Sequence, residues 1–297
     1  MTRSWTLATR FVSLTLLLCS ATAALGYDGE GAQEPRRAWA SGLSPGESGP
    51  IPLSLREDAA QFAHTSRFLF RRLFSASSRA ATFWTLGSIL GASAVLEHNK
   101  YDLQEDLLAG TSEESNEWSM RTKKLGDPGI VPGLGLLLLL EGLAFRQPRV
   151  HDTGLMILES ALYTGLFTEA GQFVLSEQRP DRGGDLSFFQ GGGHGVSGHA
   201  AIAASIAAPL SRGLFRVEAN DGGWKRFGKR LGTGLAYGLP VLTGLSRIED
   251  NRHYAWNVGL GLALGFAVGD TVADAHDSRR GGEGPRWAPD SMGPLVT

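Results

Sequence analysis

The sequence predicts an all-α protein, built as a helical bundle of about six core helices. Six apolar segments rich in Gly and Ala recur near residues 81–97, 129–145, 154–175, 196–210, 231–245 and 255–273. Several of them carry small residues four apart, as at Gly261 and Gly265 or Gly87 and Gly91, a spacing that lets helices approach closely. Runs of β-branched residues and alternating patterns, which would indicate strands, are scarce. With 297 residues, 42% of them hydrophobic and 40 of them glycine, one large domain of packed helices is expected.

The N-terminal 58 residues are expected to lie outside this domain. Residues 1–26 have the layout of a secretory signal peptide, because Arg3 and Arg10 lead into the apolar run 11–18 and small residues follow it. An uncleaved anchor helix is the alternative. Residues 27–58 lack apolar periodicity and are rich in Pro, Gly and charged residues, so we expect a disordered linker. The helical domain is then assigned to residues 59–275, and residues 276–297 to a disordered tail.

Residues 59–75 predict a basic amphipathic helix at the start of the domain. Apolar side chains such as Phe62 and Leu69 alternate there with Arg67, Arg71 and Arg72. Such a helix either packs on the bundle or lies on a membrane surface.

The sequence leaves open whether the apolar segments cross a membrane. A span needs about 20 apolar residues, and several segments are shorter. Glu141, Glu159 and Glu169 also interrupt two of them. The connections at 146–152 and 211–230 are basic and the stretch 98–119 is acidic, which favours an oriented membrane protein. We expect a protein of the cell envelope at the membrane, with a soluble periplasmic bundle as the alternative.

Composition argues against other classes of partner. The net charge is only −2 and there is no basic run, so nucleic-acid binding is not expected. The single cysteine, Cys19, excludes an internal disulfide. No H-E-x-x-H, C-x-x-C or glycine-rich P-loop is present, so no metal site is predicted.

Three short polar motifs stand at the ends of apolar segments. Arginine offers a planar fork of donors that suits phosphate oxygens, and histidine is the side chain best able to act as nucleophile or proton carrier near neutral pH. The motifs are Arg179-Pro180, Ser197-Gly198-His199, and Ser246-Arg247 followed by His253.

In this order, R-P, S-G-H and S-R-x5-H resemble the signature of the type 2 phosphatidic acid phosphatase (PAP2) and vanadium haloperoxidase superfamily. That signature is K-x6-R-P, P-S-G-H and S-R-x5-H-x3-D, and the resemblance covers roughly residues 80 to 275. Three positions depart from it, because Gln172 stands for the lysine, Val196 for the proline and Asn257 for the aspartate. A phosphate-binding cation and the carboxylate that orients the nucleophilic histidine are therefore missing.

The resemblance implies a role for each surviving residue. His253 would attack phosphorus to form a phosphohistidine, and His199 would protonate the leaving oxygen. No metal or other cofactor is needed for this route. The other positions implied in the site are the phosphoryl-binding Arg179 and Arg247, the uncharged donors Ser197, Gly198 and Gln172, and Asn257 beside the nucleophile.

The implied activity is that of an acid phosphatase or phosphatidate phosphatase-like hydrolase, acting on a phosphomonoester or a lipid phosphate and weakened by the substitutions. The alternative is an inactive protein of this fold that binds phosphate or lipid, and a vanadium haloperoxidase is a third, minor reading. Asn257→Asp is expected to restore orientation of His253 and raise turnover. Nearby residues that could replace the missing groups are Asp250, Glu249 and Asp181 for the carboxylate, and Arg182, Arg252 and His194 for the cation.

Overall fold

The computed structural model describes residues 55–74, 98–108, 119, 121–184 and 186–281. Within these residues the regular structure is helical apart from one isolated bridge between Leu175 and Phe188, which confirms the all-α fold. The helices are α2 (Leu55–Phe74), α4 (Lys100–Leu108), η1 (Lys123–Gly126), α6 (Ile130–Ala144), α7 (Pro148–Val174), η2 (Pro180–Arg182), α8 (Gly198–Ser205), α9 (Ala207–Gly213), α10 (Gly223–Glu249) and α11 (Ala255–Gly281). The expected segments 1–26 and 81–97 lie outside the described residues.

Two helices differ from the apolar segments that predicted them, each for a physical reason. Helix α10 begins at Gly223 rather than at 231, because its first turns carry basic residues that apolar density does not detect. The segment 196–210 divides into α8 and α9 at Ile206. Pro209 has no N–H to donate to the carbonyl of Ser205, so the hydrogen-bond ladder is interrupted there.

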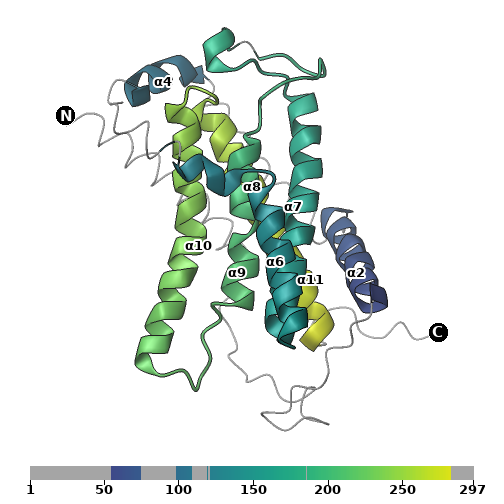
Figure 1. Cartoon of the computed structure of the whole chain (residues 1–297). Helices are drawn as coiled ribbons and strands as arrows, with labels where there is room; N and C mark the ends of the chain where they lie inside the picture. The colour runs from purple at the N-terminus through teal and green to yellow at the C-terminus, as the bar shows by residue number, and fades with distance from the viewer. Residues whose placement is uncertain (1–54, 75–97, 109–118, 120, 185, 282–297) are drawn as a thin grey trace, which may run out of the picture.

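Helices α8 and α11 form the centre of the bundle, and α6, α7 and α10 surround them (Figure 1). Helix α4 crosses one end, which we call the α4 end. On the seam between α8 and α11, three glycines of α11 four residues apart rest directly on α8 carbonyl oxygens. A Cβ on any of them would lie 2.1–2.5 Å from such an oxygen, which fixes the relative position of the two helices. The glycines are Gly261, Gly265 and Gly269, and the carbonyls belong to Ser197, Ala201 and Ser205.

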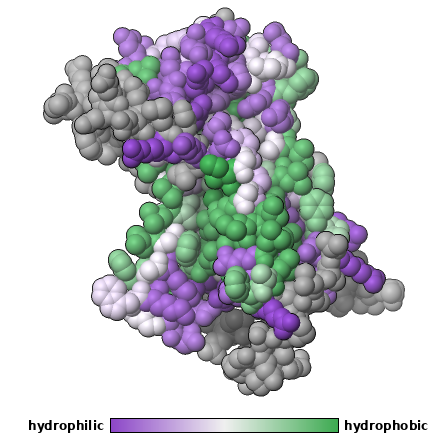
Figure 2. All heavy atoms as spheres, viewed as in Figure 1, coloured by the Kyte–Doolittle hydropathy of each residue, from purple (hydrophilic) through white to green (hydrophobic). Residues whose placement is uncertain are grey.

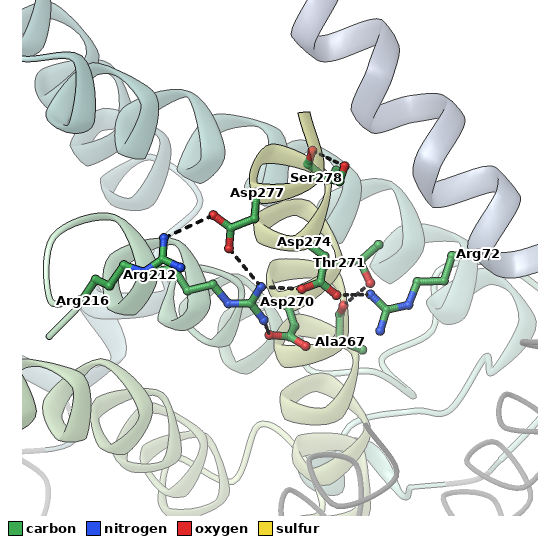
Figure 3. A network of polar contacts seen from close by, with 10 residues as sticks. Arg72, Arg212, Arg216, Ala267, Asp270, Thr271, Asp274, Asp277 and Ser278 are labelled. Atoms are coloured by element: carbon green, nitrogen blue, oxygen red, sulfur yellow. Dashed lines mark hydrogen bonds and ion pairs between the residues drawn. The ribbon is translucent and has the colours of Figure 1, made fainter. Parts of the chain in front are cut away.

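The end opposite α4 is held by charged side chains (Figure 3). Asp274 of α11 accepts a hydrogen bond from Arg72 of α2 at 2.7 Å and another from Arg212 of α9. Arg212 also reaches Asp270 and Asp277 on the same face of α11. The amphipathic helix α2 therefore packs on the bundle.

The helical domain extends further at both ends than the assignment to 59–275. Helix α2 begins at Leu55, and α11 runs to Gly281. His276 is fully buried, with Nδ1 2.9 Å from Asp152 and Nε2 3.2 Å from Glu159. Glu159 thus points into the bundle and does not interrupt an outer surface.

On the face drawn in Figure 2, exposed apolar side chains gather across the middle of the molecule, with polar surface at both ends. On α10 the exposed apolar side chains from Leu231 to Leu242 span about 17 Å at 1.5 Å per residue, which is shorter than the roughly 30 Å hydrocarbon core of a bilayer, and the exposed Trp224 and Phe227 before them lie among basic residues. Among the described helices, Ala255–Ser278 is long and apolar enough to cross a membrane. We call this surface the apolar belt; it includes Ile130, Leu136, Leu137 and Leu140 of α6, Leu162, Leu166 and Phe173 of α7, and Trp224, Phe227, Leu231, Leu235, Leu239 and Leu242 of α10.

Candidate functional site

The three motifs meet at the α4 end. Arg179 follows α7, Ser197 precedes α8, and His253 stands in the turn between α10 and α11. Backbone hydrogen bonds hold these segments together: the amide of Ser197 donates to the carbonyl of Asn257 at 3.0 Å, and the amide of His194 donates to that of Glu177 at 2.8 Å. The loop before α8 is therefore fixed between the end of α7 and the start of α11.

His253 is buried and has a defined ring orientation. Its Nδ1 lies 3.1 Å from the carbonyl oxygen of His194. A carbonyl only accepts, so Nδ1 carries the hydrogen and Nε2 keeps its lone pair. The ring of His194 packs edge-to-face against it, with ring centroids 6.2 Å apart.

The surroundings keep His253 uncharged. Burial is the main cause that lowers its pKa from 6.5 to about 3, and Arg247, His194 and Arg179 add to the shift through their charges. The pKa of His194 is lowered too, first by burial and then by Arg179 and Arg182. A neutral imidazole with a free Nε2 is the form that can attack phosphorus.

Two arginines beside His253 each carry a hydrogen-bond donor that the described residues leave unused. The Nε–H groups of Arg179 and Arg247 are buried and have no hydrogen-bond partner within the described part of the chain. Arg247 uses Nη1 to hold Asp250 at 3.0 Å. Because a buried donor without a partner costs about 1–3 kcal/mol, two such donors together indicate an anionic ligand.

The start of α8 adds uncharged donors. Ser197 is extended at φ −77° and ψ 105°, and its buried hydroxyl has no partner among the described residues. Helix α8 begins at Gly198, and the N–H groups of its first turn lie at the positive end of the helix dipole, which favours a bound anion. His199 is the second residue of α8, half-buried, and its backbone packs on Gly126 of η1, where a Cβ would lie 2.1 Å from the His199 carbonyl oxygen.

Gln172 and Asn257 both contact the backbone of the site loop. Gln172 Nε2 donates to the carbonyl of Val196 at 2.8 Å. Asn257 Nδ2 donates to Glu177 at 2.6 Å and to the carbonyl of Gly195 at 3.0 Å, and its Oδ1 accepts from the amide of Tyr254. None of these bonds goes to His253, so a carboxylate at position 257 would face Glu177. From this geometry we expect Asn257→Asp to lower turnover, and not to raise it as the motif comparison suggested.

Glu177 and Lys100 are the site neighbours that sequence reasoning missed. Glu177 is 1% exposed, and Lys100 Nζ lies 2.9 Å from it. Lys100 also donates to the carbonyl of Gly184 at 2.6 Å. Nothing in the sequence connects two residues 77 positions apart, although a lone glutamate two residues before Arg179 was a signal that could have been followed.

Two of the residues considered as replacements for the missing groups have other partners. Asp250 holds Arg247 and accepts a hydrogen bond from Ser119, and Asp181 pairs with Arg252 at 3.3 Å. His194 packs edge-to-face against the ring of His253. The motifs thus bring two buried arginine Nε–H groups and the uncharged ring of His253 to the same end of the bundle.

Comparison with known proteins confirms the resemblance read from the motifs. The family model described as the PAP2 superfamily matches residues 154–279, a stretch that contains all three motifs and Asn257 but not Lys100. No curated protein and no solved structure matches the chain.

Proposed function

We propose, starting from the PAP2 superfamily match of residues 154–279, that the chain is a hydrolase that removes the phosphoryl group from a phosphate monoester. The observation that carries the proposal is the pair of buried Nε–H groups on Arg179 and Arg247, which have no partner among the described residues and lie beside a neutral His253. Two guanidinium groups can neutralise a phosphate dianion, and the imidazole supplies the nucleophile.

In the first step the lone pair on Nε2 of His253 attacks phosphorus, and the bond from phosphorus to the ester oxygen breaks. The leaving oxygen takes a proton from His199, the role the resemblance implies for this residue. Arg179 and Arg247 hold the non-bridging oxygens as their charge is redistributed. The cationic phosphohistidine is stabilised by the His194 carbonyl, which accepts from Nδ1–H.

In the second step water attacks the phosphorus of the phosphohistidine. His199, now neutral, takes a proton from this water while the bond from phosphorus to Nε2 breaks. Phosphate leaves, and His253 returns to its neutral form with the hydrogen still on Nδ1. The proton count closes over the cycle, since the proton that His199 gives to the leaving group is replaced by one from water.

The apolar belt favours a lipid phosphate as substrate. The motifs lie at the α4 end, at one edge of the belt, where the headgroups of a surrounding bilayer would stand. A lipid whose chains remain in the membrane could present its phosphate there. This supports membrane association in the cell envelope. A small soluble phosphomonoester is the other candidate substrate, because it carries the same phosphoryl group.

The test is turnover by the purified full chain in detergent, with p-nitrophenyl phosphate and phosphatidate assayed in parallel and His253→Ala as the blank. We expect phosphate release that the blank lacks, and an acid-labile, base-stable phosphoryl adduct when the reaction is quenched in alkali. Faster turnover of phosphatidate identifies the lipid source of the phosphate. Equal release by wild type and blank would refute the proposal.

The alternative is an inactive PAP2-fold protein that binds phosphate or a phospholipid. Gln172 favours it, because its amide is occupied by the Val196 carbonyl and supplies no positive charge. Such a protein would bind inorganic phosphate through Arg179 and Arg247 without forming a phosphohistidine. Phosphate binding by a protein that shows no turnover and no adduct would establish this alternative.

A further inference from the structure

The orientation of His253 depends on a backbone group. The partner of its Nδ1 is the backbone carbonyl of His194. Since the hydrogen bond of one ring nitrogen fixes which nitrogen is free, the position of residue 194 sets the nucleophilic form of His253. Whatever fixes the loop at 194–195 therefore acts on the nucleophile.

We propose that Glu177, held between Lys100 and Asn257, is the positioning residue that replaces the missing carboxylate at 257. It acts through the loop at 194–195 and not by touching the ring. This inference rests on the proposed function, because it assigns the element that orients that nucleophile.

Both the backbone and the side chain of Glu177 contribute hydrogen bonds that hold the loop at 194–195. Its backbone carbonyl accepts from the amide of His194 at 2.8 Å. Its carboxylate accepts from Asn257 Nδ2 at 2.6 Å, and the same amide nitrogen donates to the carbonyl of Gly195 at 3.0 Å. Residues 194 and 195 are thus tied to Glu177 directly and through Asn257.

The network has a fixed direction of hydrogen bonding. Lys100 is a pure donor and Glu177 accepts on each oxygen, from Lys100 at 2.9 Å and from Asn257. Asn257 must then direct its amide nitrogen to Glu177, which leaves Oδ1 for the amide of Tyr254 at 2.9 Å. All three side chains are at most 5% exposed, so water does not substitute for a lost partner.

This direction explains why an asparagine is required. An aspartate at 257 would put two carboxylates at hydrogen-bond distance and would leave the carbonyl of Gly195 without a donor. A glutamine at 177 would keep one acceptor oxygen for two donors, so its NH2 group would face either Lys100 or Asn257. Each single change disrupts the network, whereas the exchange Glu177→Gln with Asn257→Asp restores the bond between the two side chains with donor and acceptor reversed.

The experiment compares Glu177→Gln, Asn257→Asp and the exchanged pair in the full chain. The first readout is the tautomer of His253 by nitrogen NMR of histidine-labelled protein, with the signals assigned by their loss in His253→Gln. The second is kcat and KM for p-nitrophenyl phosphate. We expect each single variant to lose the Nδ1–H tautomer as the dominant form and to lower kcat at least about tenfold. KM should stay within about threefold, since neither arginine is changed, and the exchanged pair should regain part of both losses.

Glu159→Gln is the matched control, because Glu159 is also a buried carboxylate but bonds His276 at the opposite end. It should leave the tautomer of His253 and kcat unchanged. A His253 tautomer that is the same in wild type and in both single variants would overturn the inference. Should a single variant fail to fold, the exchanged pair still decides, since a tautomer and kcat no better than in the other single variant contradict the network. A tautomer change without turnover in the wild type supports the network and refutes the hydrolase, so the two proposals fail separately.

Discussion

Nδ1 of His253 points at the backbone carbonyl of His194, 3.1 Å away, and not at a side chain. A backbone carbonyl does not titrate, so the orientation of the ring does not depend on the protonation state of an acid. The tautomer of His253 is therefore set by the conformation of one loop.

The first prediction concerns pH. The pKa of His253 is about 3 in the folded chain, below its ordinary 6.5, so between these values the unfolded chain binds a proton that the folded chain does not. The stability that this group contributes is fully present above pH 6.5 and is lost as the pH falls towards 3, by up to about 1.4 kcal/mol per pH unit. Urea unfolding of wild type and His253→Gln between pH 4 and 7.5 measures it. Wild type should lose stability more steeply than the variant; parallel curves would contradict the shift.

The second prediction separates charge from geometry at Arg179. Arg179→Lys keeps the charge but removes the buried Nε–H, so affinity for inorganic phosphate should fall about tenfold to a hundredfold. Isothermal titration calorimetry measures this without turnover. The control is Arg182→Lys, the same change on an exposed residue of η2, which should alter affinity less than threefold. Equal losses in both variants would mean that only net charge matters.

The third prediction tests the seam between α8 and α11. Gly265→Ala would bring a Cβ within 2.1 Å of the carbonyl oxygen of Ala201, so the helices must separate, and we expect a loss of about 1–3 kcal/mol or more in the free energy of unfolding. Gly259→Ala on the same helix meets nothing within 4 Å and should be neutral or stabilise by up to about 1 kcal/mol. Denaturant unfolding of the pair decides, and equal effects would argue against this packing.

The fourth prediction tests the apolar belt. Leu137→Lys on α6 and Leu235→Lys on α10 each place a charge where the belt would contact lipid, at about 2.5–3.5 kcal/mol per lysine near the bilayer centre. Both side chains are at least half exposed, so the fold should remain. In flotation with phosphatidylcholine vesicles, the double variant should be recovered with lipid much less than wild type. Val217→Lys, in the connection between α9 and α10, should float as wild type does, and an unchanged double variant would refute a membrane-embedded belt.

The helical class and most helices could be predicted because apolar segments with small residues four apart lead directly to packed helices. The pairing of Gly261 and Gly265 with α8 is an example. The convergence of Arg179 with His253 at one end came from motif order and not from periodicity.

The inner contacts of the site could not be predicted in the same way. The partner of His253 Nδ1 is a main-chain carbonyl, which leaves no trace in side-chain identity. The ion pair of Lys100 and Glu177 joins residues on separate segments, and its existence depends on burial that only the fold defines. Compared with the family pattern, Asn257 lacks the carboxylate of the aspartate. In the fold, an amide suits this position because its nitrogen donates a hydrogen bond to the carboxylate of Glu177.

The ion pair of Lys100 with Glu177 also limits how the chain can be shortened. Lys100 lies upstream of the matched stretch 154–279, while its carboxylate partner lies within it. A fragment cut to the matched stretch would remove Lys100 and break this buried pair, which typically costs about 3–5 kcal/mol, a large share of the 5–15 kcal/mol that stabilises a typical domain. The smallest unit that can be expressed for study must therefore begin before α4.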